Sequence, residues 1–176
     1  MHATNNRATS HFALLHFFAS THTTISRTCI TLLRMYREDT SKSQLSIIIP
    51  AFNEERCILA TLTYLSSCLE PPPHEILVVD GGSTDRTYHL VREFISQGGG
   101  RGINIRVLKS PHKGRAAQQN FGASKSSKKK GDLLLFLHAD TLPPRDVVTL
   151  VRGALSERRT VLGGFVSLLT TPSKTW

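Results

Sequence analysis

The residues with the clearest chemical potential stand where an apolar run ends. Leu133–Leu137 is apolar without alternation and is followed at once by His138, Ala139 and Asp140. Such a run is typical of a strand buried on both faces of a parallel sheet, where ligands bind beyond the carboxyl ends of the strands. A carboxylate there suits a hard cation such as Mg²⁺ or Mn²⁺, which takes few protein oxygens and completes its shell with phosphate and water. Asp140 is therefore the candidate metal ligand, with His138 beside it. The alternative is a loop whose aspartate caps a helix.

Two further polar clusters follow apolar runs upstream, after Leu45–Ile49 and after Glu75–Val79. They read Pro50-Ala51-Phe52-Asn53-Glu54-Glu55 and Asp80-Gly81-Gly82-Ser83-Thr84-Asp85. Asp80 is an acceptor suited to a nucleobase N–H or a ribose hydroxyl, and Gly82 lets backbone N–H groups approach a ligand closely. The alternative is a tight turn that Asp80 caps. The spacing matches neither G-x-G-x-x-G nor a P-loop, so the common nucleotide fingerprints are not supported.

Basic residues open the helix expected after the third strand. Lys113, Gly114 and Arg115 stand at its start, where the helix dipole disfavours cations. An anionic ligand would explain this placement, and Arg115 has the geometry to bind a diphosphate with two hydrogen bonds. The alternative is ordinary surface charge at a helix start.

Apolar runs and helical stretches alternate from residue 44 onward, which predicts an α/β fold with a mostly parallel sheet and helices on both faces. We expect strands at about 45–49, 75–79, 103–108, 132–137 and 161–169. We expect helices at about 54–68, 84–97, 114–128 and 144–157. The polar clusters then stand at strand ends and the basic cluster at a helix start.

Composition narrows the class of protein. The 176 residues suffice for one domain with a core, and the net charge of +9 suits nucleotides, phosphates, acidic lipid or nucleic acid. No recognition motif or aromatic platform supports nucleic-acid binding. Three cysteines without a C-x-x-C pair predict free thiols in a reducing compartment, with the cytoplasm as the default location. No stretch is long and apolar enough to span a membrane, which leaves peripheral membrane contact open.

Residues 1–43 differ from the rest of the chain. They are rich in serine, threonine and histidine, and no acidic residue occurs before Glu38. This composition is typical of an organelle transit peptide, and the alternative is a disordered extension. The predicted domains are a disordered or targeting extension at 1–43 and a folded domain at 44–176.

The four motifs, in this order and spacing, resemble those of family 2 glycosyltransferases with the GT-A nucleotide-sugar fold. The resemblance covers residues 45 to about 169 and rests on Ile49–Glu55, Val79–Asp85, Lys113–Arg115 and Leu137–Asp140. The His-Ala-Asp and Asp-Gly-Gly-Ser forms are similar to a bacterial-type subgroup described as radical-SAM/selenodomain-associated transferases. The resemblance implies that residues 44–176 are the donor-binding part of such an enzyme, incomplete at the C-terminus.

The resemblance also implies roles for single residues. The nucleoside pocket would be lined by Pro50, Phe52 and Glu54. Asp80 would contact the base or ribose, Arg115 would reach the nucleotide or its phosphates, and Asp140 would be the metal-binding aspartate of the D-x-D element. The implied donor is a UDP- or GDP-sugar, the implied cofactor is Mg²⁺ or Mn²⁺, and the acceptor is unknown. Family 2 enzymes invert the anomeric carbon and use a carboxylate base.

Two positions depart from the family pattern. His138 stands where the first Asp of D-x-D is usual, and Gly81 stands where the second Asp of Asp-Asp-Gly-Ser is usual. Gly163-Gly164-Phe165 resembles the acceptor-side glycine motif, but the later acidic motif does not follow, so no catalytic base is assigned. Two other hypotheses stay open: a truncated, non-catalytic nucleotide-binding protein, and a nucleotidyltransferase on a related fold.

Overall fold

The centre of the fold is a seven-stranded sheet in the order β1-β7-β2-β6-β3-β4-β5. The computed structural model describes residues 14–15, 29–34, 43–100, 102–127, 133–156 and 162–166. The strands are β1 (Leu14–Leu15), β2 (Cys29–Arg34), β3 (Leu45–Ala51), β4 (Glu75–Asp80), β5 (Asn104–Lys109), β6 (Leu133–Phe136) and β7 (Leu162–Val166). The helices are α1 (Ile58–Ser67), α2 (Thr87–Ser96), α3 (Arg115–Lys125) and α4 (Val147–Ala154).

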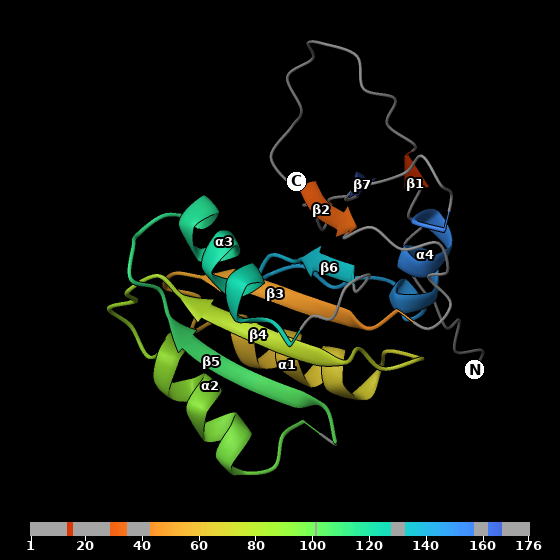
Figure 1. Ribbon diagram of the computed structural model, residues 1–176. Helices are drawn as coiled ribbons and strands as arrows, with labels where there is room; N and C mark the ends of the chain where they lie inside the picture. The colour runs from red at the N-terminus through yellow and green to blue at the C-terminus, as the bar shows by residue number, and fades with distance from the viewer. Residues whose placement is uncertain are drawn as a thin grey trace, which may run out of the picture.

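The four strands β6, β3, β4 and β5 are parallel and lie side by side (Figure 1). β3 pairs with β4 from Ser46 opposite Glu75 to Ala51 opposite Asp80, and β6 lies on its other side. The runs of β3, β4 and β6 are largely apolar without alternation because helices cover both faces of the sheet. The register places the carboxyl ends of the strands at one edge, which confirms the predicted α/β fold.

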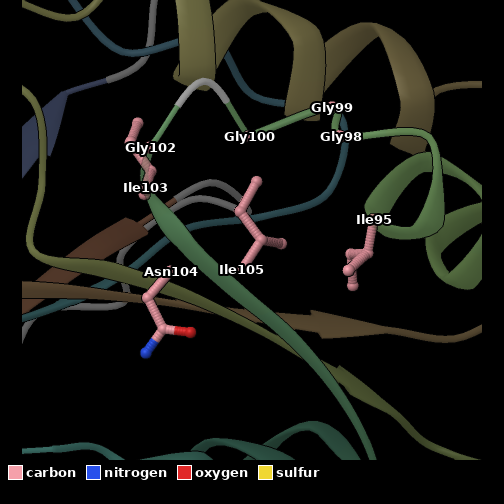
Figure 2. Close-up of a pocket in the computed structure, with 8 residues that line it drawn as sticks. All are labelled: Ile95, Gly98, Gly99, Gly100, Gly102, Ile103, Asn104 and Ile105. Carbon is pink, nitrogen blue, oxygen red and sulfur yellow. The ribbon is translucent and has the colours of Figure 1, made fainter.

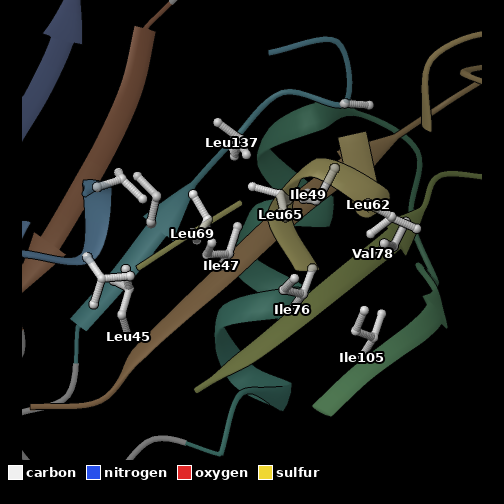
Figure 3. Packing of buried hydrophobic residues seen from close by; sticks show 14 of the residues in the cluster. Leu45, Ile47, Ile49, Leu62, Leu65, Leu69, Ile76, Val78, Ile105 and Leu137 are labelled. Atoms are coloured by element: carbon white, nitrogen blue, oxygen red, sulfur yellow. The ribbon is translucent and has the colours of Figure 1, made fainter. Parts of the chain in front are cut away.

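Alternate residues of the strands face opposite layers. Ile47 and Ile49 of β3 belong to the larger core cluster, together with Leu62 of α1 and Val148 of α4 (Figure 3). Ile48, which lies between them, belongs to a smaller cluster against which residues of α3 pack. Helix α3 therefore covers one face alone, and α1, α2 and α4 cover the other.

Two helical glycines test how closely α3 lies on the sheet. A Cβ at Gly122 of α3 would lie 2.5 Å from Cγ2 of Ile48 and 3.0 Å from Cγ2 of Val79. A Cβ at Gly153 of α4 would meet no described atom within 4 Å. Since alanine is favoured over glycine in a helix by about 1 kcal/mol, we expect Gly153→Ala to raise the free energy of unfolding by up to that amount. We expect Gly122→Ala to lower it by about 1–3 kcal/mol, because the added methyl overpacks the interface.

Denaturant titration followed by circular dichroism measures both changes, and Gly153→Ala is the matched control for Gly122→Ala. A gain in stability from Gly122→Ala would contradict the close approach of α3 to β3 and β4.

Two strands lie within residues 1–43. β2 pairs antiparallel with both β6 and β7, and β1 pairs with β7. Neither strand was expected from the sequence. Residues 29–34 are rich in apolar and β-branched types that suit a strand, but their partners are distant in sequence, with Thr31 opposite Phe136. No local pattern predicts such a pairing. Targeting by residues 1–43 stays a prediction.

Three of the four helices begin about three residues later than the sequence predicts. Helix α1 begins at Ile58 because residues 54–57 form a turn in which the carbonyl of Glu54 accepts hydrogen bonds from the N–H groups of Cys57 and Ile58. Helix α3 begins at Arg115, within one residue of the expectation. Within the described ranges, no helix is long and apolar enough to cross a membrane. Cys57 and Cys68 are free thiols, as expected.

Candidate functional site

The predicted site residues gather at the carboxyl edge of the parallel strands. Pro50 is the last residue but one of β3, Asp80 ends β4, and His138 and Asp140 follow β6. Arg115 is the first residue of α3, the helix that covers this edge from one face. Phe52 has 51% of its surface exposed, so its ring is available to a ligand. The sheet thus brings together motifs that are up to 90 residues apart in sequence.

The loops after β3 and β4 hold each other by reciprocal hydrogen bonds. The backbone N–H of Asn53 donates to Oγ of Ser83 (3.0 Å), and the N–H of Glu54 donates to Oγ1 of Thr87 (2.8 Å). In return, the N–H of Thr84 donates to Oδ1 of Asn53 (2.9 Å). Asn53 adopts the left-handed conformation (φ 58°) that asparagine tolerates better than most residues. The first two motifs therefore form one rigid unit.

Asp85 is the most connected side chain of this unit. Its carboxylate accepts hydrogen bonds from the N–H groups of Glu55 (3.1 Å) and Thr87 (2.9 Å) and from the Thr87 hydroxyl. Burial raises the pKa of Asp85, but the hydrogen bonds from Thr87 and Glu55 outweigh it, so the pKa lies below its ordinary value. From the sequence, Asp85 was expected only to favour the first turn of the second helix; its bond with Glu55, in another loop, was not predicted.

Replacing Asp85 with alanine should therefore lower the free energy of unfolding by about 2 kcal/mol, since several donors lose a charged acceptor. Thermal unfolding followed by circular dichroism measures this. The matched control is Asp146→Ala: Asp146 is exposed and makes no capping hydrogen bond at the start of α4. Equal effects of the two substitutions would show that the bonds of Asp85 do not hold the loops.

Asp80 supports the glycine turn that follows it. Only 3% of its surface is exposed, and Oδ2 accepts hydrogen bonds from the N–H groups of Gly82 (3.1 Å) and Ser83 (3.2 Å). Gly82 has φ 87°, which glycine adopts without strain. A Cβ at Gly82 would lie 4.0 Å from Cε of Lys113, so this lysine reaches over the turn. Asp80 therefore caps a tight turn, which is the alternative to ligand contact that the sequence left open. Gly82 and Lys113 lie at the surface.

Three charged groups, Glu54, Arg115 and Asp140, lie within electrostatic range of His138. Burial first, and then the positive charge of Arg115, lower the pKa of His138, while Asp140 and Glu54 act in the opposite direction without outweighing them. His138 is therefore neutral at neutral pH and has a lone pair for a hydrogen bond or a metal ion. The structure thus places Glu54, Arg115 and Asp140 close enough to His138 to act on its charge.

Cys57 fixes the carboxylate of Glu54 in this group. Its thiol donates to Oε2 of Glu54 across 3.1 Å. Burial, then this hydrogen bond and the charges of Glu54 and Asp140, raise the pKa of Cys57 to about 12. The thiol is therefore a poor nucleophile and a donor to Glu54, a contact that sequence reasoning missed.

Helix α1 anchors the loop that carries Asp140. The Thr61 hydroxyl donates to the carbonyl of Ala139 (2.6 Å), and the Tyr64 hydroxyl donates to the carbonyl of Pro143 (2.7 Å). The carboxylate of Asp140 is exposed, and Oδ1 accepts a hydrogen bond from the hydroxyl of Thr141 (3.2 Å). Because the backbone is held on both sides of Asp140, its carboxylate has a defined place at the sheet edge.

The residues at this edge fit a hard divalent cation that is shared with a phosphate ligand. No group of three or more His, Cys, Asp or Glu side chains converges on a metal position in the part of the chain that the structure describes. A cation that needs many protein ligands does not fit this donor set. Mg²⁺ and Mn²⁺ do fit, because they are held by one or two carboxylates and complete their shell with phosphate oxygens and water.

A separate hollow of about 260 Å³ lies at the other end of the sheet, beside the start of β5 (Figure 2). The residues that line it are Ile95, Gly98, Gly99, Gly100, Gly102, Ile103, Asn104 and Ile105. None of these described lining residues carries a charge. The hollow is therefore a poor match for an anionic ligand and is remote from Asp80, Arg115 and Asp140.

Similarity to known proteins agrees with this geometry. Residues 46–169, more than half of the chain, match the model of the family "Glycosyl transferase family 2". The chain is 33% identical over 128 residues to the probable glycosyltransferase YdaM of Bacillus subtilis, covering 69% of this chain and 29% of that protein. It is 25% identical over 133 residues to a dodecaprenyl-phosphate galacturonate synthase of Rhizobium johnstonii, covering 71% and 36%. The chain thus spans about a third of the length of these relatives.

Solved structures share the fold. The mannosyltransferase PcManGT from Pyrobaculum calidifontis, in complex with GDP-Man and Mn²⁺, superposes with a TM-score of 0.52 at 24% identity, covering 66% of this chain and 34% of that one. TarS 1–349 of S. aureus, in complex with UDP, has a TM-score of 0.51 at 22% identity, covering 64% and 32%. Both support the GT-A fold that the motifs predicted. With its motifs, sheet order and family match in agreement, the chain belongs to glycosyl transferase family 2.

Proposed function

We propose that residues 44–176 form the donor-binding part of a metal-assisted, inverting glycosyltransferase that uses a UDP- or GDP-sugar. The observation that carries this proposal is the meeting of Arg115, His138 and Asp140 at the carboxyl edge of the sheet, beside the rigid loops after β3 and β4. A basic group and a carboxylate that share an edge suit a diphosphate bridged by a cation.

Each predicted residue has a role in this proposal. The nucleoside would lie on the first motif, against Pro50, Phe52 and Glu54. The turn at Asp80 and Gly82 would present backbone N–H groups and the nearby ammonium of Lys113 to the nucleotide. Arg115 would bind a phosphate through two parallel hydrogen bonds, and neutral His138 would support Asp140 or share its cation.

Asp140 would hold Mg²⁺ or Mn²⁺ against the diphosphate. The bound cation supplies Lewis-acid stabilisation of the negative charge that develops on the departing nucleoside diphosphate. Arg115 and Lys113 would add positive charge at the same leaving group. The donor sites named for the solved relatives, with GDP-Man and Mn²⁺ or with UDP, support this assignment.

A thermal-shift series on the whole chain tests the proposal. We expect UDP or GDP in the presence of Mn²⁺ to raise the unfolding temperature, and we expect CMP, AMP and inorganic phosphate to raise it less, because they lack the diphosphate or the base. A rise of equal size with every anion would instead indicate general charge attraction to a basic surface. Stabilisation by UDP or GDP that does not depend on Mn²⁺ would favour the non-catalytic nucleotide-binding hypothesis.

A further inference from the structure

The side chain of Gln118 joins the ends of two central strands. It is 4% exposed, and its Nε2 donates hydrogen bonds to the backbone carbonyls of Ala51 (2.8 Å) and Val79 (2.7 Å). These carbonyls belong to the carboxyl ends of β3 and β4. The opposite amide orientation would point Oε1 at both carbonyls, so the two hydrogen bonds fix the orientation of the amide. Gln118 therefore ties α3 to both strands at once.

The amide of Gln118 also occupies the space beside Gly81. A Cβ at Gly81 would lie 2.8 Å from both Cδ and Nε2 of Gln118 and 3.0 Å from Oε1. The backbone of Gly81 does not have a positive φ, so its conformation alone does not demand glycine. The neighbouring amide is therefore what excludes a side chain at position 81. This is the position at which the family motif usually has its second aspartate.

The bonds of Gln118 lie next to three of the predicted contacts of the nucleotide. Ala51 precedes Phe52, Val79 precedes Asp80, and Gln118 is one helical turn after Arg115. On the same face of α3, Gly122 lies against Ile48 and Val79, so the helix has little freedom to shift. The first two motifs and the first turn of α3 thus share one fixed frame.

We propose that Gln118 is a positioning residue of the donor site and that its amide restricts position 81 to glycine. This inference rests on the proposed function. Gln118 holds Arg115 at a set distance from the loops that carry Phe52 and Asp80. Gly81 is glycine because the amide takes the space of its side chain.

A double-mutant cycle on the whole chain tests this pairing. The variants are Gln118→Ala, Gly81→Asp and the double substitution, with Gln119→Ala as the matched control from the next position of α3. Calorimetric titration with UDP and GDP in Mn²⁺ gives the affinities, at a temperature where circular dichroism shows each variant folded. We expect Gln118→Ala and Gly81→Asp each to lower the affinity for the tighter-binding nucleotide by about tenfold. Gln119→Ala should lower this affinity by less than twofold. We expect the double variant to bind more tightly than either single variant, because the aspartate enters the space that the amide leaves.

Either of two results would overturn the inference. One is a fold-loss of affinity in the double variant that equals the product of the two single fold-losses. The other is wild-type affinity in Gln118→Ala. If Gly81→Asp does not fold, Gly81→Ala completes the same cycle with a smaller side chain. If the wild type binds neither UDP nor GDP, the proposed function fails. The contact between Gln118 and position 81 is then tested by the free energies of unfolding of the same variants in urea. Additive losses of stability in that cycle would overturn it as well.

Discussion

Replacing Asp140 with alanine is expected to weaken the binding of UDP or GDP in Mn²⁺ by about 100-fold and to make the remaining binding independent of the metal. A cation shared between a carboxylate and a diphosphate contributes several kcal/mol, and Asp140 is the exposed carboxylate at the edge where Arg115 and His138 meet. The measurement is calorimetric titration of each nucleotide with and without Mn²⁺.

The fold should survive this substitution, because Asp140 is exposed and its described hydrogen bond is to its neighbour Thr141. Asp146→Ala, an exposed aspartate in the same connection, is the matched control and should keep wild-type affinity and metal dependence. Metal-dependent binding of undiminished strength in Asp140→Ala would mean that the cation is held elsewhere.

Replacing Glu75 with alanine is expected to lower the free energy of unfolding by about 3 kcal/mol, or roughly 10 °C in unfolding temperature. Its side chain is fully buried at the start of β4 and forms an ion pair with Arg106 (2.9 Å). It also accepts hydrogen bonds from the Ser46 hydroxyl (2.9 Å) and from the N–H of Ser127 (2.6 Å). Losing this carboxylate removes the acceptor of four donor groups on Ser46, Arg106 and Ser127, which lie in separate parts of the chain.

Thermal unfolding followed by circular dichroism measures the effect, and Glu93→Ala is the control. Glu93 is exposed on α2 and accepts a hydrogen bond from Gln97, which directly follows this helix, so its loss should change stability by less than about 0.5 kcal/mol. Similar losses from the two substitutions would show that the buried carboxylate contributes no more than a surface one.

The buried carboxyl of Glu75 also predicts that the stability of the fold depends on pH. Burial raises the pKa of Glu75, but the hydrogen bonds from Ser127, Ser46 and Arg106 outweigh it, so the pKa lies below its ordinary value of 4.5. The unfolded chain therefore takes up this proton before the folded chain does. The contribution of Glu75 is complete above about pH 4.5 and is lost as the pH falls through the folded pKa. The stability difference between wild type and Glu75→Gln should accordingly shrink below pH 4.5, and a difference that stays constant to pH 3 would contradict this.

The sequence predicted the parts of the fold that depend on local pattern. The apolar runs that became β3, β4 and β6 are strands within two residues of their expected ends, because burial on both faces leaves a clear signal. The turn before α1 was missed because the backbone bonds from Cys57 and Ile58 to Glu54 depend on loop geometry. The strand β2 was missed because its partners, β6 and β7, lie far away along the chain.

In the candidate site, too, the residues that a local pattern predicts differ from those that depend on distant contacts. His138, Asp140 and Arg115 were predicted from residue type and from their place beside a strand or a helix. Asn53, Asp85 and Gln118 were not, because their partners lie in other loops or on other strands. A pattern that shows only neighbours in sequence does not reveal contacts between loops 30 residues apart. The similarity to the radical-SAM-associated subgroup stays a prediction from the His-Ala-Asp and Asp-Gly-Gly-Ser forms.

The most direct test of the account is calorimetric titration of the wild-type chain with UDP and with GDP, each in Mn²⁺ and in a chelator. The account predicts that one nucleoside diphosphate binds with one-to-one stoichiometry and that the chelator weakens this binding by at least tenfold, because Asp140 and the diphosphate share the cation. Absence of binding to both nucleotides, or equal binding with and without the metal, would contradict the claim that this sheet edge is a metal-assisted donor site.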